Sequence, residues 1–101
     1  MDSLRQALTT RARAIISDPS CWTQSAAARD ALSRPVSPAS AEALTFCGYG
    51  ALMRALHERG LSDRWLVEVF NAAALTQLIH SNDSGTHADA LASLHALGSN
   101  G

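Results

Sequence analysis

Residues 65–79 read WLVEVFNAAALTQLI, and apolar side chains from this stretch cover most of the circumference of a helix. Arg64, Glu68 and Asn71 mark one narrow polar edge. A helix that is apolar nearly all round is usually buried. The stretch therefore predicts a helix over residues 63–80 at the centre of a helical bundle.

On the N-terminal side, a second pattern predicts an amphipathic helix over residues 3–17. Apolar residues recur there at three- and four-residue spacing: Leu4, Leu8, Ala12, Ile15 and Ile16. We expect this helix to end before Asp18 and Pro19, because a residue that precedes proline avoids the helical conformation.

A further helix is predicted over residues 39–59. Ser37 and Pro38 are typical of a helix start, and Gly60 is typical of the left-handed residue that ends a helix. Small residues form a strip within it: Cys47, Gly48, Gly50, Ala51 and Ala55. Glycine within a helix costs about 1 kcal/mol relative to alanine. We therefore expect the strip to let another backbone segment come close.

The last helix is predicted over residues 86–97. Thr86 and Asp89 have the spacing of a capping box, in which each side chain satisfies a backbone amide of the first turn. Leu91, Leu94 and Leu97 would then face the core.

Residues 18–37 show neither helical nor alternating periodicity. They predict an irregular loop or a short hairpin around residues 29–36, although residues 26–28 would also suit one helical turn. The expected fold is mainly all-α: a compact four-helix domain that spans residues 1–101.

The composition agrees with one small helical domain. The chain has 101 residues, of which 47% are hydrophobic and only 5% aromatic. This length is enough for one core. Alanine and leucine, the best helix formers, supply most of the apolar residues, and β-branched residues are scarce.

The charge pattern excludes some partners. Nine acids and eight bases give a formal net charge of -1, and every base is arginine. Without a basic run, nucleic acid is not an expected partner. The sequence has no apolar run of roughly 20 residues and no signal peptide, so we expect no membrane contact and a cytoplasmic location. Cys21 and Cys47 would be reduced thiols there.

Three sequence blocks together resemble a family of small bacterial and phage proteins, the domain of unknown function DUF6197. The blocks are WTQ…ARD…RPV at Trp22 to Val36, FCGYGAL at Phe46 to Leu52, and SNDSGTHADAL at Ser81 to Leu91. Ser25 and Ser33 stand where that family commonly has glycine, and Tyr49 stands where it has a small residue. The resemblance implies a shared helical fold and carries no established activity across. We expect no cofactor.

One enzymatic hypothesis uses Cys47 as nucleophile, His87 as base and Asp83 as the acid that orients the base. A thiol-dependent hydrolase or transferase needs a thiolate beside an imidazole. The alternative is structural, because a cysteine among alanines and glycines within a helix usually acts as a small apolar residue.

A metal hypothesis uses His80, Asp83, His87 and His95. The spacing H-x-x-D-x-x-x-H would converge only if the turn between the last two helices folds back, and it matches no standard zinc or calcium pattern. The simpler interpretation places His87 in the first turn of a helix, with Asn82 and Asp83 bonded to backbone amides of the preceding turn.

A recognition hypothesis concerns the loop between the first two helices. It groups polar and aromatic residues that are common at interfaces: Trp22, Thr23, Gln24, Arg29 and Asp30. The alternative is that Trp22 covers the open end of the bundle and Arg29 pairs with a carboxylate or caps a helix.

We expect a non-enzymatic interaction or regulatory module that binds another protein or forms a homodimer. The thiol-dependent enzyme is the second hypothesis. A third, a small phage-type inhibitor of a host system, follows only from where such families are found.

Overall fold

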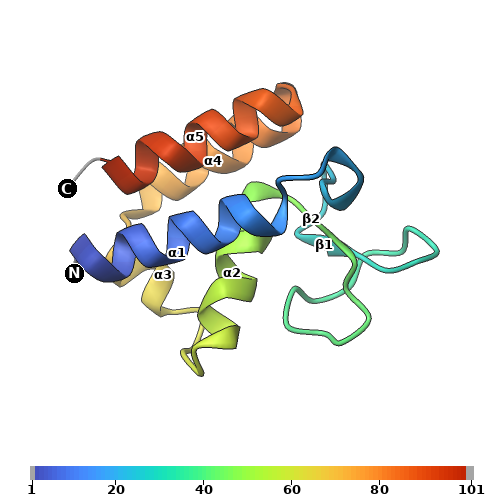
Figure 1. The fold of residues 1–101 in the computed structure, drawn as a ribbon, viewed down its shortest axis with the longest axis horizontal. Helices are drawn as coiled ribbons and strands as arrows, with labels where there is room; N and C mark the ends of the chain where they lie inside the picture. Colours follow the sequence, from blue (N-terminus) through green and yellow to red (C-terminus); the bar gives the residue numbers. More distant parts are fainter. Residues whose placement is uncertain (1, 100–101) are drawn as a thin grey trace.

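The computed structural model of the chain describes residues 2–99, and it is mainly helical (Figure 1). Five α-helices and a two-stranded sheet lie within these residues, so the expected mainly helical fold is confirmed and the count of four helices is wrong. The elements are α1 (Asp2–Ile15), the 3₁₀ turn η1 (Pro19–Cys21), β1 (Ala28–Arg29), β2 (Thr45–Phe46), α2 (Gly48–Glu58), α3 (Trp65–Val69), α4 (Ala72–Ser84) and α5 (His87–Ser99).

The helices form one body, and the segments around β1 and β2 extend from one end of it (Figure 1). Helix α1 packs against α5 and α2, and α4 packs against the same two helices. The core is aliphatic, as the composition predicts. Its large, fully buried apolar side chains are Leu8, Ile16, Leu52, Leu56, Leu66 and Leu94.

The predicted helix over residues 63–80 is two helices, α3 and α4, broken at Phe70 and Asn71. Both residues are extended, and the Asn71 side chain accepts a hydrogen bond of 2.8 Å from Ala74 N. Asparagine is one of the strongest helix N-caps, so it begins α4 here rather than continuing α3.

The expected position of this stretch at the centre of the bundle is also wrong. Val67 is 58% exposed and Ile79 is 38% exposed, although Leu66, Val69 and Leu78 are buried. The most continuous buried stripe lies on α2 instead, at Gly48, Gly50, Ala51, Leu52, Ala55 and Leu56. Helix α2 contacts α1, α3, α4 and α5. Its small residues suit the centre because they let helices approach closely.

The predicted helix over residues 39–59 begins nine residues late, at Gly48. The side chains of Ser37 and Ser40 accept hydrogen bonds from the backbone amides of Ala39 and Glu42, respectively. The chain makes two turns there. Arg54 of α2 donates to the carbonyl oxygens of Pro38 and Ser40 at 3.0 and 2.9 Å. Serine side chains offer the backbone local alternatives to a helix, and Arg54 stabilises the resulting turns.

The irregular region therefore extends from residue 16 to residue 47 rather than over 18–37. Within it β1 pairs with β2 antiparallel, Ala28 opposite Phe46. The short hairpin expected around residues 29–36 is present as a turn, with an antiparallel bridge between Arg29 and Pro35. Ser25 and Ser33 have φ of 64° and 61°, the left-handed conformation that glycine adopts most readily.

The expected close approach at the small-residue strip is confirmed at Gly50. A Cβ atom built there would lie 1.8 Å from the carbonyl oxygen of Ala27, so only glycine fits. Gly60 has φ of 73°, and Leu61 N bonds back to Leu56 O at 3.0 Å, as a glycine-terminated helix end requires.

The last helix agrees with the sequence. Thr86 N donates to Asp89 Oδ2 at 2.9 Å and Asp89 N donates to Thr86 Oγ1 at 3.2 Å, so the capping box is formed. Leu94 is fully buried, and Leu91 and Leu97 pack partly buried against the core. None of the helices within residues 2–99 is long and apolar enough to cross a membrane.

Candidate functional site

The side chain of Asn82 is fully buried and joins three segments that are far apart in the sequence. Its Oδ1 accepts hydrogen bonds from Trp22 Nε1 at 2.7 Å and Gly48 N at 2.9 Å. Its Nδ2 donates to Thr23 O at 3.1 Å and Asp83 Oδ1 at 3.0 Å. A buried amide with both donors and both acceptor positions used is stable and orients its partners.

Residues 22–25 also cap the C-terminal end of α4. Gln24 Nε2 donates to Asn82 O and Gly85 O, both at 2.9 Å, and Ser25 N donates to Asp83 Oδ1 at 2.9 Å. The last carbonyl groups of a helix have no partner within the helix. The WTQS segment therefore closes the end of α4 and is fixed by it.

Arg29 and Asp30 continue this internal bonding. Arg29 donates to Thr23 Oγ1 at 3.0 Å, Gln24 O at 3.2 Å and Ser33 O at 2.9 Å. The Asp30 carboxylate accepts the backbone amides of Arg34 and Leu32 and the Arg34 guanidinium, and these bonds lower its pKa. The five residues predicted to bind a partner thus bond within the chain, and their role in recognition stays a prediction.

The ring of His87 lies against Trp22, with 5.6 Å between ring centroids. Its Nε2 is 2.5 Å from the carbonyl oxygen of Ile16, just past the end of α1. Because a carbonyl only accepts hydrogen bonds, Nε2 carries the proton. His87 therefore holds the end of α1 to the start of α5.

Cys47 is the N-cap of α2, not a residue within a helix as the sequence suggested. Its Sγ accepts a hydrogen bond of 3.2 Å from Gly50 N, and the residue is only 5% exposed. Burial raises the pKa of the Cys47 thiol, and the nearby Asp83 carboxylate acts in the same direction. A nucleophilic cysteine needs the opposite, a pKa lowered by positive charge.

The proposed catalytic set is only partly assembled. A hollow of about 210 Å³ is lined by Ser25, Ala26, Ala27, Cys47, Tyr49, Ile79 and Asp83. His87 is not part of this lining, and its Nε2 is engaged by Ile16 O. The geometry brings Cys47 and Asp83 together without the base that the enzymatic hypothesis needs.

The residues of the metal hypothesis do not form a cluster. His95 Nδ1 lies 3.3 Å from an Arg13 guanidinium nitrogen, His87 faces Ile16 O, and Asp83 bonds to residues 25 and 82. His80 lines a separate polar hollow with Asp89. Within residues 2–99, no group of three or more His, Cys, Asp or Glu is placed to hold a metal ion.

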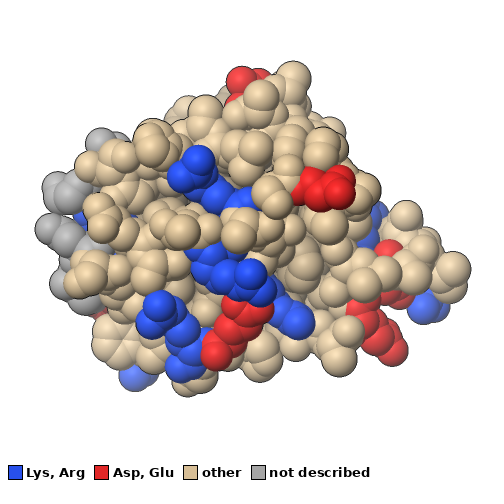
Figure 2. Space-filling model, in the orientation of Figure 1, with Lys and Arg blue, Asp and Glu red and all other residues tan. Residues whose placement is uncertain are grey.

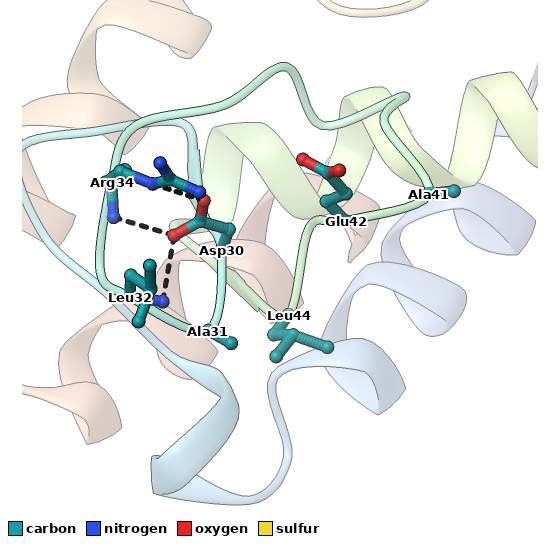
Figure 3. Close-up of a pocket in the computed structure, with 7 residues that line it drawn as sticks. All are labelled: Asp30, Ala31, Leu32, Arg34, Ala41, Glu42 and Leu44. Atoms are coloured by element: carbon teal, nitrogen blue, oxygen red, sulfur yellow. Dashed lines mark hydrogen bonds and ion pairs between the residues drawn. The ribbon is translucent and has the colours of Figure 1, made fainter.

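An apolar hollow of about 420 Å³ lies on the outlying turns, between residues 30–34 and residues 41–44 (Figure 3). Its lining is Asp30, Ala31, Leu32, Arg34, Ala41, Glu42 and Leu44. Four large apolar side chains are exposed in the described part of the chain, and two of them are here: Leu32 at 71% and Leu44 at 55%.

Each side of this hollow carries one leucine and one exposed charged side chain, and Asp30, which also lines it, is buried and pairs with Arg34. Leu32 and Arg34 come from one segment, and Leu44 and Glu42 come from the facing segment (Figure 3). Both signs of charge are visible on these turns, whereas arginines gather over α1 and the lower part of α2 (Figure 2). Its lining is therefore mainly apolar, and the exposed charges on its two sides, Arg34 and Glu42, are opposite.

No known family, curated protein or solved structure matches this chain. The resemblance to the DUF6197 family thus stays a prediction. The three blocks on which it depends do meet in space, because Trp22, Gly48 and Asn82 are hydrogen-bonded to one another through the Asn82 side chain.

Two features were missed by the sequence reasoning. Asn82 was expected only to bond backbone amides in a turn, and nothing local shows that its amide spans three segments. Leu32 lies in a segment without periodicity, and this is a usable signal, whereas Leu44 lies within residues 39–59, where the sequence predicted a helix. A leucine that belongs to no helical or alternating pattern has no predicted core position, so it is a candidate for the surface.

Proposed function

We propose that this chain is a non-enzymatic protein-interaction module whose docking surface is the hollow between Leu32 and Leu44, the leucine hollow. The observation that carries the proposal is the exposure of these two leucines, 71% and 55%, on opposite sides of one apolar cavity. Clustered exposed apolar side chains mark interaction sites more often than single ones do.

The scaffold beneath the leucine hollow supports this role. The turn that carries Leu32 is fixed by the Asp30 carboxylate, which bonds Leu32 N and Arg34 N at 2.9 Å each. Leu44 is fixed by its amide, which donates to Arg29 O at 2.9 Å. Both leucines are therefore held out in defined positions, and a preorganised surface loses less conformational entropy on binding.

The alternative, a thiol-dependent enzyme, has weaker support. Cys47 is buried, its pKa is raised, and the hollow beside it is not lined by His87. Binding through an apolar surface needs none of these groups. The proposed module therefore uses Cys47 and His87 to fold, and the leucine hollow to bind.

Site-specific photo-crosslinking tests this function. A photoreactive phenylalanine analogue at position 32 or 44, in cells that express the full chain natively, is expected to give a protein adduct of discrete mass. The matched control is position 67, where Val67 is also exposed but lies on α3 away from the hollow. Adducts from position 67 alone, or from none of the three positions, would contradict the proposal.

A further inference from the structure

We infer that the occupant of the leucine hollow is a second copy of the same chain, in a two-fold symmetric pair. This inference rests on the proposed function, because it uses the same surface. It names the partner from the arrangement of charge around the hollow.

A two-fold interface must be complementary to itself, since the same patch contributes both sides. The leucine hollow satisfies this condition. A two-fold axis that runs between its two walls would place Leu32 of one copy over Leu44 of the other, and Arg34 of one copy over Glu42 of the other (Figure 3). Every contact would then occur twice.

The charged residues are available for such a contact. Arg34 uses Nε for its 2.9 Å bond to Asp30, and 67% of its side chain remains exposed. Glu42 is exposed, and its carboxylate makes no hydrogen bond or ion pair within residues 2–99. The pairing would give each Glu42 a guanidinium partner that its own chain does not supply.

The size of the surface sets the strength of the pair. Seven residues line the hollow, fewer than the roughly 20–30 residues that each side of a standard stable interface contributes. The pair is therefore weak, with dissociation in the range of about 10 µM to about 1 mM. It also weakens as salt rises, because the charged rims are exposed.

Sedimentation equilibrium on the full chain, from about 10 µM to about 1 mM, measures the association directly. The wild type is expected to dimerise reversibly. Leu32→Ser and Leu44→Ser should each weaken the dimer by about tenfold or more, the loss typical of a central interface residue. Val67→Ser is the control and should leave it unchanged. A wild type that stays monomeric throughout, or a dimer that only Val67→Ser disrupts, overturns the inference.

A charge-exchange experiment tests the geometry. Glu42→Arg alone sets two guanidinium groups against each other in the pair, and Arg34→Glu alone sets two carboxylates together, so each variant should be more monomeric than the wild type. Mixed in equal amounts, they should form a heterodimer, because each copy then offers the charge that the other lacks.

Circular dichroism first confirms that Arg34→Glu folds without its Asp30 bond. Should it not fold, Glu42→Arg against Glu42→Gln carries the test, and only the arginine variant should lose the dimer. Failure to form the heterodimer, or equal dimerisation of these two Glu42 variants, overturns the inference.

These results separate the inference from the proposed function. A monomeric chain that still crosslinks to another protein through position 32 refutes self-association and keeps the docking function. A monomeric chain without any adduct refutes both.

Discussion

The indole nitrogen of Trp22 donates a 2.7 Å hydrogen bond to the side-chain oxygen of Asn82, across 60 positions of sequence. The same oxygen accepts the amide of Gly48 at the start of α2. One buried amide thus sets the position of the loop after α1, the start of α2 and the end of α4.

Asn82→Ala is expected to lower the free energy of unfolding by about 2–4 kcal/mol, because each buried group left without a partner costs about 1–3 kcal/mol. The groups that lose their partner would be Trp22 Nε1, Gly48 N and Thr23 O. Urea unfolding followed by tryptophan fluorescence and by circular dichroism measures the change. Ser84→Ala, at an exposed position of the same helix, is the control. A loss below about 0.5 kcal/mol for Asn82→Ala, the size of an ordinary surface effect, would contradict this role.

Gly50→Ala is expected to destabilise the chain by at least about 2 kcal/mol, although alanine is the better helix former. The new Cβ would lie 1.8 Å from the rigid carbonyl oxygen of Ala27. Gly48→Ala is the matched control in the same helix, since its Cβ would meet Leu78 Cδ1 at 3.2 Å, the end of a side chain that can shift. Thermal unfolding should rank the two in this order, and equal melting temperatures would refute the explanation.

Ser33→Gly is expected to stabilise the chain by up to about 1 kcal/mol. A left-handed conformation costs an ordinary residue about 1–2 kcal/mol, and the greater freedom of unfolded glycine offsets part of that gain. Ser33 has φ of 61°, and its hydroxyl makes no hydrogen bond in the described part of the chain, so no contact is lost. Ser33→Val should destabilise the chain. Calorimetry of both variants measures these changes, and a destabilising Ser33→Gly or a stabilising Ser33→Val would contradict the prediction.

The sequence predicted the features that depend on neighbouring residues. Asp18 and Pro19 end α1, Gly60 ends α2, and Thr86 with Asp89 begins α5, each through contacts within a few positions. Local backbone preferences determine such boundaries, so they can be read from single residues.

The features that the sequence did not predict correctly depend on contacts from elsewhere in the chain. The apolar pattern continues across Asn71, so it does not show that the side chain of this residue turns to cap α4. The late start of α2 depends on Arg54 and on pairing of Thr45 and Phe46 with β1. The hydrogen bonds that meet at the Asn82 side chain depend on tertiary packing, which no local sequence pattern shows.

The carboxylate of Asp30 should make stability depend on pH. Its pKa is lowered, first by the Arg34 amide and also by the Arg34 guanidinium and the Leu32 amide. Such a group stabilises the fold above the usual aspartate pKa of about 3.9, and the contribution is lost as pH falls through the lower folded value. The stability difference between wild type and Asp30→Asn should therefore shrink as the pH falls from about 5 to about 2, the range in which the carboxylate is neutralised.

Urea unfolding at a series of pH values checks this expectation. Glu42→Gln is the control, because it removes a nearby carboxylate that makes no hydrogen bond within residues 2–99. A difference between wild type and Asp30→Asn that stays constant with pH would show that the Asp30 charge does not stabilise the turn.

The last prediction concerns Cys47 and separates a structural from a nucleophilic thiol. Disulfide exchange and alkylation require the thiolate and access to the sulfur. Cys47 is 5% exposed, which limits access to the sulfur, and burial raises its pKa, which disfavours the thiolate. In a Cys21→Ser variant, reaction of Cys47 with an aromatic disulfide at pH 8 should be at least about a hundredfold slower in buffer than in urea, since it must await local opening of the fold.

Cys47→Ser, with Cys21 present, is the control for an accessible thiol and should react far faster in buffer. A native Cys47 that reacts within about threefold of its rate in urea would have thiolate character and access. That result would restore the enzymatic hypothesis and place the chemistry in the hollow between Cys47 and Asp83.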